Sequence, residues 1–184
     1  MPHCFSPKVT QSLLLVVDIQ VKLAPAMPLY EKVKKVASNL AAASSLHKVP
    51  ILVTEQYKQG LGATDTQLQK QLGDACWFDK TYFSAYKEAG FKELIASYNK
   101  DHIIVVGMEA HVCVLQTCLD LLDHGYSVFL VVDGVCSRQD THRDNAVAQL
   151  QSAGAVITNA ETVIFQWTEV ANSPLFKDIL KIVK

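Results

Sequence analysis

The sequence predicts an α/β fold of three layers, α/β/α, around an open and mainly parallel sheet of about six strands. Three observations predict it: short apolar runs rich in Val, Ile and Leu, helix-length segments between those runs, and the absence of internal repeats or linkers. Parallel strands buried on both faces have near-continuous apolar runs, and joining them requires crossovers of helix length. We expect residues 1–184 to form one domain, a usual size for a single core.

The first half of the chain supplies three of the strands. The run from Ser12 to Gln20 predicts a buried strand that ends at a carboxylate. Residues 31–48 predict an amphipathic helix, because the apolar positions Val33, Val36, Leu40 and Ala43 lie near one stripe. The remaining elements are a strand at 50–56, a short helix with a Thr or Asp cap at 64–72, a short strand and loop at 75–85, and a helix at 90–98.

The second half continues the alternation. Continuous apolar runs at 102–107 and 127–135 predict two more strands, and residues 155–158 predict a weak sixth strand. A helical pattern begins near Cys113, and residues 174–183 close the chain as a helix. Right-handed crossovers place these helices on both faces of the sheet.

Composition excludes several classes of partner. Apolar residues make up 49% of the chain and charged residues 19%, which is typical of a well-packed globular domain. The 17 basic and 18 acidic residues nearly cancel, so no strong field would hold nucleic acid or an anionic membrane. We therefore expect a small-molecule substrate, with neither nucleic acid nor a membrane as partner.

The cellular location follows from two further features. The N-terminal sequence has neither a basic start nor the apolar run of a signal peptide. Five cysteines are present, an odd number without a CxxC pair, which favours reduced thiols. We expect an intracellular, cytoplasmic protein.

Chemistry-bearing side chains gather at the predicted strand ends. In open α/β sheets, ligands bind beyond the carboxyl ends of the strands. A carboxylate, an ammonium and a thiol can therefore meet there; the residues at successive strand ends are Asp18 and Gln20, Glu55 and Gln56, Asp79 and Lys80, Glu109 and Cys113, and Asp133.

Cys113 is either a small core residue or a nucleophile. At the start of a helix, free backbone N–H groups and the helix dipole favour the thiolate, and Lys80 would add a positive charge. Asp18 could take the thiol proton and return it to a leaving group. Gly107 allows a tight bend in "GMEAHVC", whose backbone N–H groups could bind an oxyanion. As alternatives, Asp18 could cap a turn and Lys80 could be solvated in a loop.

Three segments carry a family resemblance. "LLVVDIQ", "FDKTYFSA" and "VVGMEAHVCV" resemble the signature segments of the isochorismatase-like cysteine hydrolases, which have a Rossmann-like α/β fold. "TEQYKQGLG" resembles the single-domain eukaryotic isochorismatase domain-containing proteins. The resemblance implies Asp18 as base, Lys80 as the second polar member and Cys113 as nucleophile. It also implies a cis peptide between Met108 and Glu109, with the N–H groups of Glu109 and Cys113 forming the oxyanion hole.

Departures from relatives narrow the expected activity. Nicotinamidases of this superfamily carry an Asp and two His near the second strand, whereas this chain has no histidine there, so we expect no metal and no cofactor. Isochorismatases proper lack the nucleophilic thiol, so isochorismate is not the expected substrate. The sequence favours a cysteine hydrolase that cleaves a small amide or related carbonyl compound through a thioester. The alternatives are a regulatory scaffold of the same fold and, ranked lower, RNA processing.

Candidate substrate-binding residues are Gln20, Gln56 and Tyr82. For the two glutamines, a hydrogen bond to a loop backbone is an equal alternative. Tyr82, with Tyr57 and Phe83, could line an apolar pocket or belong to the core. His111 is a weak candidate for the base, because helical geometry turns it away from Cys113. The apolar C-terminal segments favour a homo-oligomer.

Overall fold

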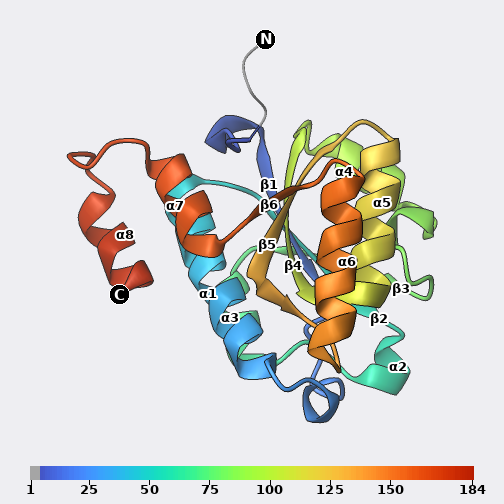
Figure 1. The fold of residues 1–184 in the computed structure, drawn as a ribbon. Helices are drawn as coiled ribbons and strands as arrows, with labels where there is room; N and C mark the ends of the chain where they lie inside the picture. The colour runs from blue at the N-terminus through green and yellow to red at the C-terminus, as the bar shows by residue number, and fades with distance from the viewer. Residues whose placement is uncertain (1–4) are drawn as a thin grey trace.

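The computed structural model describes residues 5–184 and contains one six-stranded sheet (Figure 1). The strand order is β3-β2-β1-β4-β5-β6, and every neighbouring pair is parallel. The strands are β1 (Ser12–Val17), β2 (Ile51–Gln56), β3 (Cys76–Lys80), β4 (His102–Met108), β5 (Ser127–Cys136) and β6 (Val156–Thr158). This confirms the predicted fold class. Cys4 lies outside the described residues.

Helices cover both faces of the sheet. They are α1 (Tyr30–His47), α2 (Lys58–Leu61), α3 (Thr66–Leu72), α4 (Phe91–Ser97), α5 (Leu115–Asp123), α6 (Asp140–Ser152), α7 (Ala160–Thr168) and α8 (Phe176–Val183). Figure 1 shows α1, α3 and α7 on one face and α4, α5 and α6 on the other, with α8 outside α1 and α7. Between residues 5 and 184, no helix has the length and apolar character needed to cross a bilayer.

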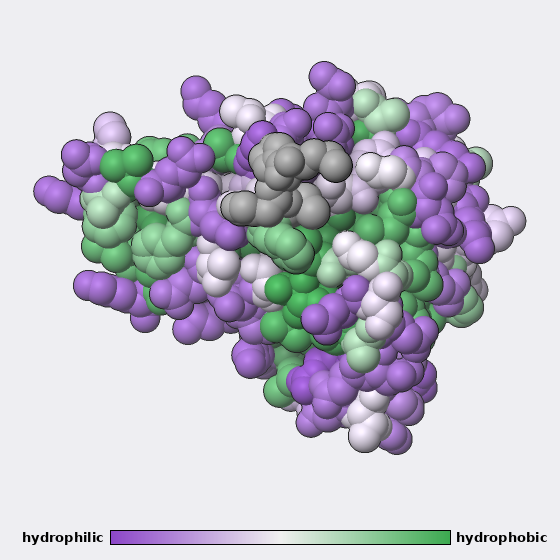
Figure 2. Space-filling model, turned by 45° about the horizontal axis from the view of Figure 1, so that its top comes forward, coloured by the Kyte–Doolittle hydropathy of each residue, from purple (hydrophilic) through white to green (hydrophobic). Residues whose placement is uncertain are grey.

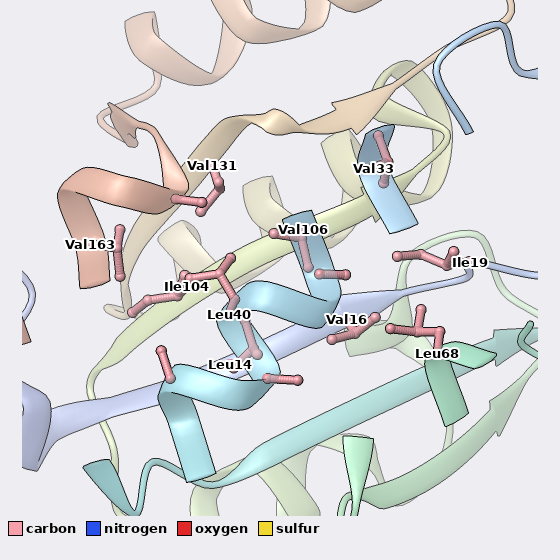
Figure 3. Close-up of a cluster of buried hydrophobic side chains, with 14 of the residues drawn as sticks. Leu14, Val16, Ile19, Val33, Leu40, Leu68, Ile104, Val106, Val131 and Val163 are labelled. Atoms are coloured by element: carbon pink, nitrogen blue, oxygen red, sulfur yellow. The ribbon is translucent and has the colours of Figure 1, made fainter. Parts of the chain in front are cut away.

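Alternate residues of each central strand enter opposite halves of the core. Leu14 and Val16 pack with Leu40 of α1 in one cluster, as Figure 3 shows, whereas Leu13 and Leu15 belong to the cluster on the other face. All six residues of β1 are fully buried. Burial on both faces is the physical reason that this strand lacks the polar alternation of a half-exposed strand.

Two helix starts show local capping. Asp65 accepts hydrogen bonds from the N–H groups of Gln67 and Leu68, so the Asp cap that the sequence predicted at the start of α3 is confirmed. Asn159 caps α7 in the same way through the N–H of Thr162. Each cap satisfies a backbone donor that the first helical turn leaves free.

The sequence analysis did not predict α6. Only Ala146 and Leu150 of this helix are buried. A helix that buries so few side chains lacks the apolar periodicity by which helices are recognised in a sequence. The short helix α2 and the helix α7 were also not predicted.

Hydrophilic residues cover much of the face seen in Figure 2, and hydrophobic residues gather near its centre and in the lobe at its left. That lobe is where Figure 1 places α8. Only Ile179 of α8 is buried, and five apolar neighbours are half-buried: Leu175, Phe176, Leu180, Ile182 and Val183. The C-terminal helix therefore keeps apolar surface in contact with solvent.

Gly107 allows β4 to approach β1 near their carboxyl ends. Its φ angle is +134°, and a Cβ added there would lie 2.0 Å from the carbonyl oxygen of Val17. Another side chain would therefore force apart the two strands that carry Asp18 and the Cys113 turn.

Gly107→Ala is expected to destabilise the fold by about 3 kcal/mol or more, because backbone strain adds to a clash with a fixed main-chain atom. Gly125→Ala is the matched control: Gly125 also has a positive φ, +85°, but nothing lies within 4 Å of its added Cβ. This control should lose only about 1–2 kcal/mol. Urea unfolding measures both variants, and equal losses would contradict the close-approach explanation.

Candidate active site

Three residues from separate elements meet at the carboxyl edge of the sheet. Asp18 directly follows β1, Lys80 ends β3, and Cys113 lies in a π-helical turn, Ala110–Val114, that follows β4. Asp18 is fully buried, and the exposed fractions of Lys80 and Cys113 are 2% and 6%. Because β1 lies between β2 and β4, parallel pairing brings these strand ends together.

The backbone turns sharply as soon as β1 ends. Asp18 has a left-handed φ of +52°, a conformation that Asp tolerates better than most residues. Its N–H still donates to Thr54 O at 3.1 Å, which continues the ladder with β2, while its carbonyl accepts from the N–H of Gln20 at 2.8 Å. The turn thus fixes the backbone from which the Asp18 carboxylate reaches Thr54 and Lys80.

The ammonium group of Lys80 is saturated with acceptors. Its Nζ lies 2.7 Å from Asp18 Oδ2 and 2.6 Å from Gln56 Oε1. The carbonyl oxygens of Tyr82 and Phe83 lie at 3.3 Å and 3.2 Å from the same atom. Since an ammonium has three N–H bonds, none is left over for a bound molecule. Lys80 can therefore influence the site only through its charge and through its ion pair with Asp18. The alternative that Lys80 is solvated in a loop is wrong.

Asp18 is held at both carboxylate oxygens. Oδ2 pairs with Lys80, and Oδ1 accepts from the hydroxyl of Thr54 at 2.7 Å. Neither side chain of the ion pair is exposed to solvent. A buried carboxylate is stable only with such a partner, because an unpaired charge in this environment would be costly.

The thiol of Cys113 interacts with both members of the ion pair. Burial raises its pKa most strongly, the Asp18 carboxylate raises it further, and Lys80 opposes the rise. Because Asp18 and Lys80 nearly cancel as charges, desolvation decides the outcome. A thiolate at rest was expected from the sequence, and this expectation is corrected: burial and the Asp18 carboxylate favour the protonated thiol of Cys113.

The start of the helix also differs from expectation. Cys113 was expected to begin the helix, but the turn begins at Ala110, and Cys113 is its fourth residue. The peptide bond between Met108 and Glu109 is cis. Glu109 directly follows β4 and precedes the turn that carries Cys113.

The amide groups of both candidate glutamines are used within the protein. Gln20 donates through Nε2 to the carbonyls of Gln56 (3.0 Å) and Gly62 (2.5 Å), and its Oε1 accepts from the N–H of Gln56 at 2.7 Å. Gln56 accepts from Lys80 and donates through Nε2 to Thr81 O at 2.7 Å. The sequence left open whether these glutamines bind the substrate or bond to a loop backbone. The observed hydrogen bonds correspond to the second role.

The three aromatic residues at the strand ends are surface residues. The exposed fractions are 56% for Tyr57, 56% for Tyr82 and 54% for Phe83, so the core alternative is wrong for them. The carbonyls of Tyr82 and Phe83 contact Lys80, which places their backbone at the site. Substrate binding by the Tyr82 side chain stays a prediction.

His111 belongs to a neighbouring contact rather than to the ion pair. Its Nδ1 lies 2.9 Å from Ser137 Oγ, and its ring centroid lies 4.7 Å from that of His142. Burial is the main cause that lowers the pKa of His111. Its contacts thus tie the turn that carries Cys113 to the end of β5 and the start of α6.

Thr54 is the site residue that the sequence analysis missed. A signal for it existed: Thr54 and Gln56 are two positions apart and therefore project from the same face of β2. Since β2 was predicted to run parallel to β1, that face could have been placed beside Asp18.

One recess of the surface adjoins the site. It has a volume of about 380 Å³ and is lined by Tyr57, Lys58, Gln59, Asp79, Lys80, Thr81 and Glu88. A larger one of about 790 Å³ lies along α7, without any of the three central residues. The chemistry of the side chains identifies the site better than cavity size does. Among residues 5–184, no three His, Cys, Asp or Glu side chains are grouped as metal ligands.

The fold and the site together define a class: a parallel α/β domain whose carboxyl edge brings a buried Asp–Lys pair against a cysteine. Residues 12–162 match the family model described as "Isochorismatase domain". The chain therefore belongs to the isochorismatase family, and the predicted resemblance is confirmed.

Relatives match most of the chain. It is 40% identical over 151 residues to the secreted isochorismatase effector Isc1 of Phytophthora sojae, covering 80% of this chain and 72% of that protein. It is 36% identical over 173 residues to isochorismatase domain-containing protein 2A of Mus musculus, covering 94% and 82%. The solved structure of MAR1 ribonuclease from Caenorhabditis elegans is similar with a TM-score of 0.90 and 37% identity, covering 96% and 91%.

A double-mutant cycle measures the ion pair. Lys80→Met alone should destabilise the fold by about 3–5 kcal/mol, because it leaves the Asp18 charge buried without a partner. Combining it with Asp18→Asn removes that charge, so the double variant should be more stable than Lys80→Met alone. Free energies of urea unfolding give the coupling, and strictly additive losses would show that the pair does not behave as a unit.

The resting state of Cys113 can be seen by ultraviolet absorbance. Because the pKa of this thiol is raised, native protein and Cys113→Ala should show the same thiolate absorbance from about pH 6 to about pH 9. The absorbance of the other cysteines is the same in both proteins and cancels when one spectrum is subtracted from the other. A difference that titrates at or below the ordinary thiol pKa of about 8.5 would contradict a resting thiol.

Proposed function

We propose that this protein is a cofactor-independent cysteine hydrolase that cleaves a small amide or a related carbonyl compound through a thioester on Cys113. The observation that carries the proposal is the buried Asp18–Lys80 pair, 2.7 Å apart, acting on the thiol of Cys113. A base, a fixed positive charge and a sulfur nucleophile are the groups that acyl transfer from an amide carbon requires.

The proposed reaction has two halves. Asp18 takes the proton from the Cys113 sulfur as the sulfur attacks the carbonyl carbon, and the N–H groups of Glu109 and Cys113 bind the resulting oxyanion. Asp18 then gives that proton to the leaving nitrogen, so the C–N bond breaks and an amine departs. Asp18 next deprotonates a water that attacks the thioester, and proton return to the sulfur releases the acid. The sum is amide plus water giving acid plus amine.

Lys80 holds the Asp18 carboxylate in place in this scheme. Its three N–H bonds are directed at Asp18, Gln56 and the carbonyls of Tyr82 and Phe83, so it is not itself the proton carrier. Gln20, Gln56 and Tyr82 would then shape the site, the two glutamines through their internal hydrogen bonds.

Turnover of a panel of small amides tests the proposal. Cys113→Ala should reduce turnover at least ~10³-fold, since removing a nucleophile ends covalent catalysis. Cys118→Ala is the matched control, because Cys118 is fully buried on α5 and has no part in the proposed chemistry. The proposal fails if Cys113→Ala keeps the activity of the native chain. A scaffold of this fold would show no turnover in any variant.

RNA cleavage is the second candidate. The specific observation in its favour is the similarity to a C. elegans protein whose solved structure is that of a ribonuclease, at 37% identity. The formal net charge of −1 does not support strong phosphate binding. Cleavage of RNA by the purified native chain that is lost in Asp18→Asn would favour this candidate.

Assembly and location complete the proposal. We propose that residues 1–184 act as one domain in a homo-oligomer, with the half-buried apolar side chains of α8 as the surface available for contact. An intracellular location is supported by the free thiols of Cys76, Cys113, Cys118 and Cys136. The P. sojae relative, by its name, is secreted.

A further inference from the structure

Two residues of β2 contact the ion pair from the same side. Thr54 and Gln56 lie two positions apart, so both project from one face of the strand. Thr54 donates to Asp18 Oδ1 at 2.7 Å, and Gln56 accepts from Lys80 at 2.6 Å. Thr54 is fully buried and Gln56 is 7% exposed. The intervening Glu55 points elsewhere, to the N–H of Thr64 and to Lys58.

Gln56 is fixed by its own surroundings. Its Nε2 donates to Thr81 O at 2.7 Å, and its backbone N–H and carbonyl both bond to the Gln20 amide. A flipped side-chain amide would point an NH₂ group at the Lys80 ammonium and a carbonyl at the Thr81 carbonyl, which are two repulsive contacts. The oxygen of Gln56 therefore stays on Lys80, and Lys80 stays on Asp18 Oδ2.

Thr54 is the remaining donor to Asp18. A carboxylate only accepts hydrogen bonds, so the Thr54 hydroxyl must direct its proton to Oδ1. With one donor on each oxygen, the carboxylate cannot rotate without breaking a hydrogen bond.

We propose that Thr54 is a positioning residue that holds the Asp18 carboxylate toward Cys113, in the orientation in which it can accept the thiol proton. This inference rests on the proposed function, because it assigns a role to Thr54 through Asp18. A purely structural role makes a different prediction. Valine has nearly the shape of threonine, so a residue needed only to fill space would tolerate Thr54→Val without a change in pH dependence.

The test follows alkylation of Cys113 by iodoacetamide across pH, with each cysteine peptide quantified by mass spectrometry. It requires no knowledge of the substrate. Cys76, which is partly exposed, reports the reagent's own pH dependence in the same sample. The reactivity of Cys113 should fall at acid pH, where Asp18 becomes protonated and can no longer accept the thiol proton.

The fall in Cys113 reactivity at acid pH is the acid limb of its pH profile. Thr54→Val should move this acid limb to higher pH by on the order of one unit, because the carboxylate has lost one of its two donors. Thr54→Ser keeps the hydroxyl and should restore the native limb. The matched control is Thr168→Val, another buried threonine, whose hydroxyl contacts Ile164 O and His47 on α7 and α1. It should leave the limb in place.

Asp18→Asn separates the two possible failures. If the acid limb persists in Asp18→Asn, Asp18 is not the base and the proposed function fails. If Asp18→Asn abolishes the limb but Thr54→Val leaves it unmoved, the proposed function stands and the role of Thr54 is overturned. A limb that moves in Thr54→Val and does not return in Thr54→Ser also overturns it.

Discussion

The buried ion pair between Asp18 and Lys80 is the interaction on which the rest of the site depends. The two charges lie 2.7 Å apart with no solvent exposure, so each is tolerable only because the other is present. They come from β1 and β3, which are separated by β2, and the pair therefore reaches across the strand that supplies Thr54 and Gln56. The parallel sheet thus positions the charges of Asp18 and Lys80 in a region from which water is excluded.

Burial, with little net charge left beside the sulfur, determines the protonation state of Cys113. A lone lysine beside Cys113 would favour a thiolate, but a lysine already neutralised by Asp18 has little field left to do so. Burial then keeps the proton on sulfur and raises the pKa of the thiol. In the proposed mechanism, proton transfer to Asp18 would therefore accompany attack by the sulfur instead of preceding it.

Much of this arrangement could be predicted from the sequence, for identifiable reasons. Continuous apolar runs predicted the strands, and the rule for carboxyl strand ends gave nine candidate residues. The chemistry of acyl transfer and the family resemblance then singled out Asp18, Lys80 and Cys113. Helix α6 escaped because only Ala146 and Leu150 are buried. The role of Thr54 could not be predicted because it depends on the register between β1 and β2. The protonation state of Cys113 could not be predicted because it depends on how the charges of Asp18 and Lys80 offset each other in space. A sequence shows which residues are charged, but it does not show how close their charges lie to one another.

The most direct test is to stop turnover of a small amide within its first cycles and to weigh the peptide that contains Cys113. The account predicts that this peptide gains the mass of the acyl group, and that the gain disappears in Asp18→Asn. An unmodified Cys113 peptide during active turnover, or an acyl group found on another residue, would contradict covalent catalysis at this site.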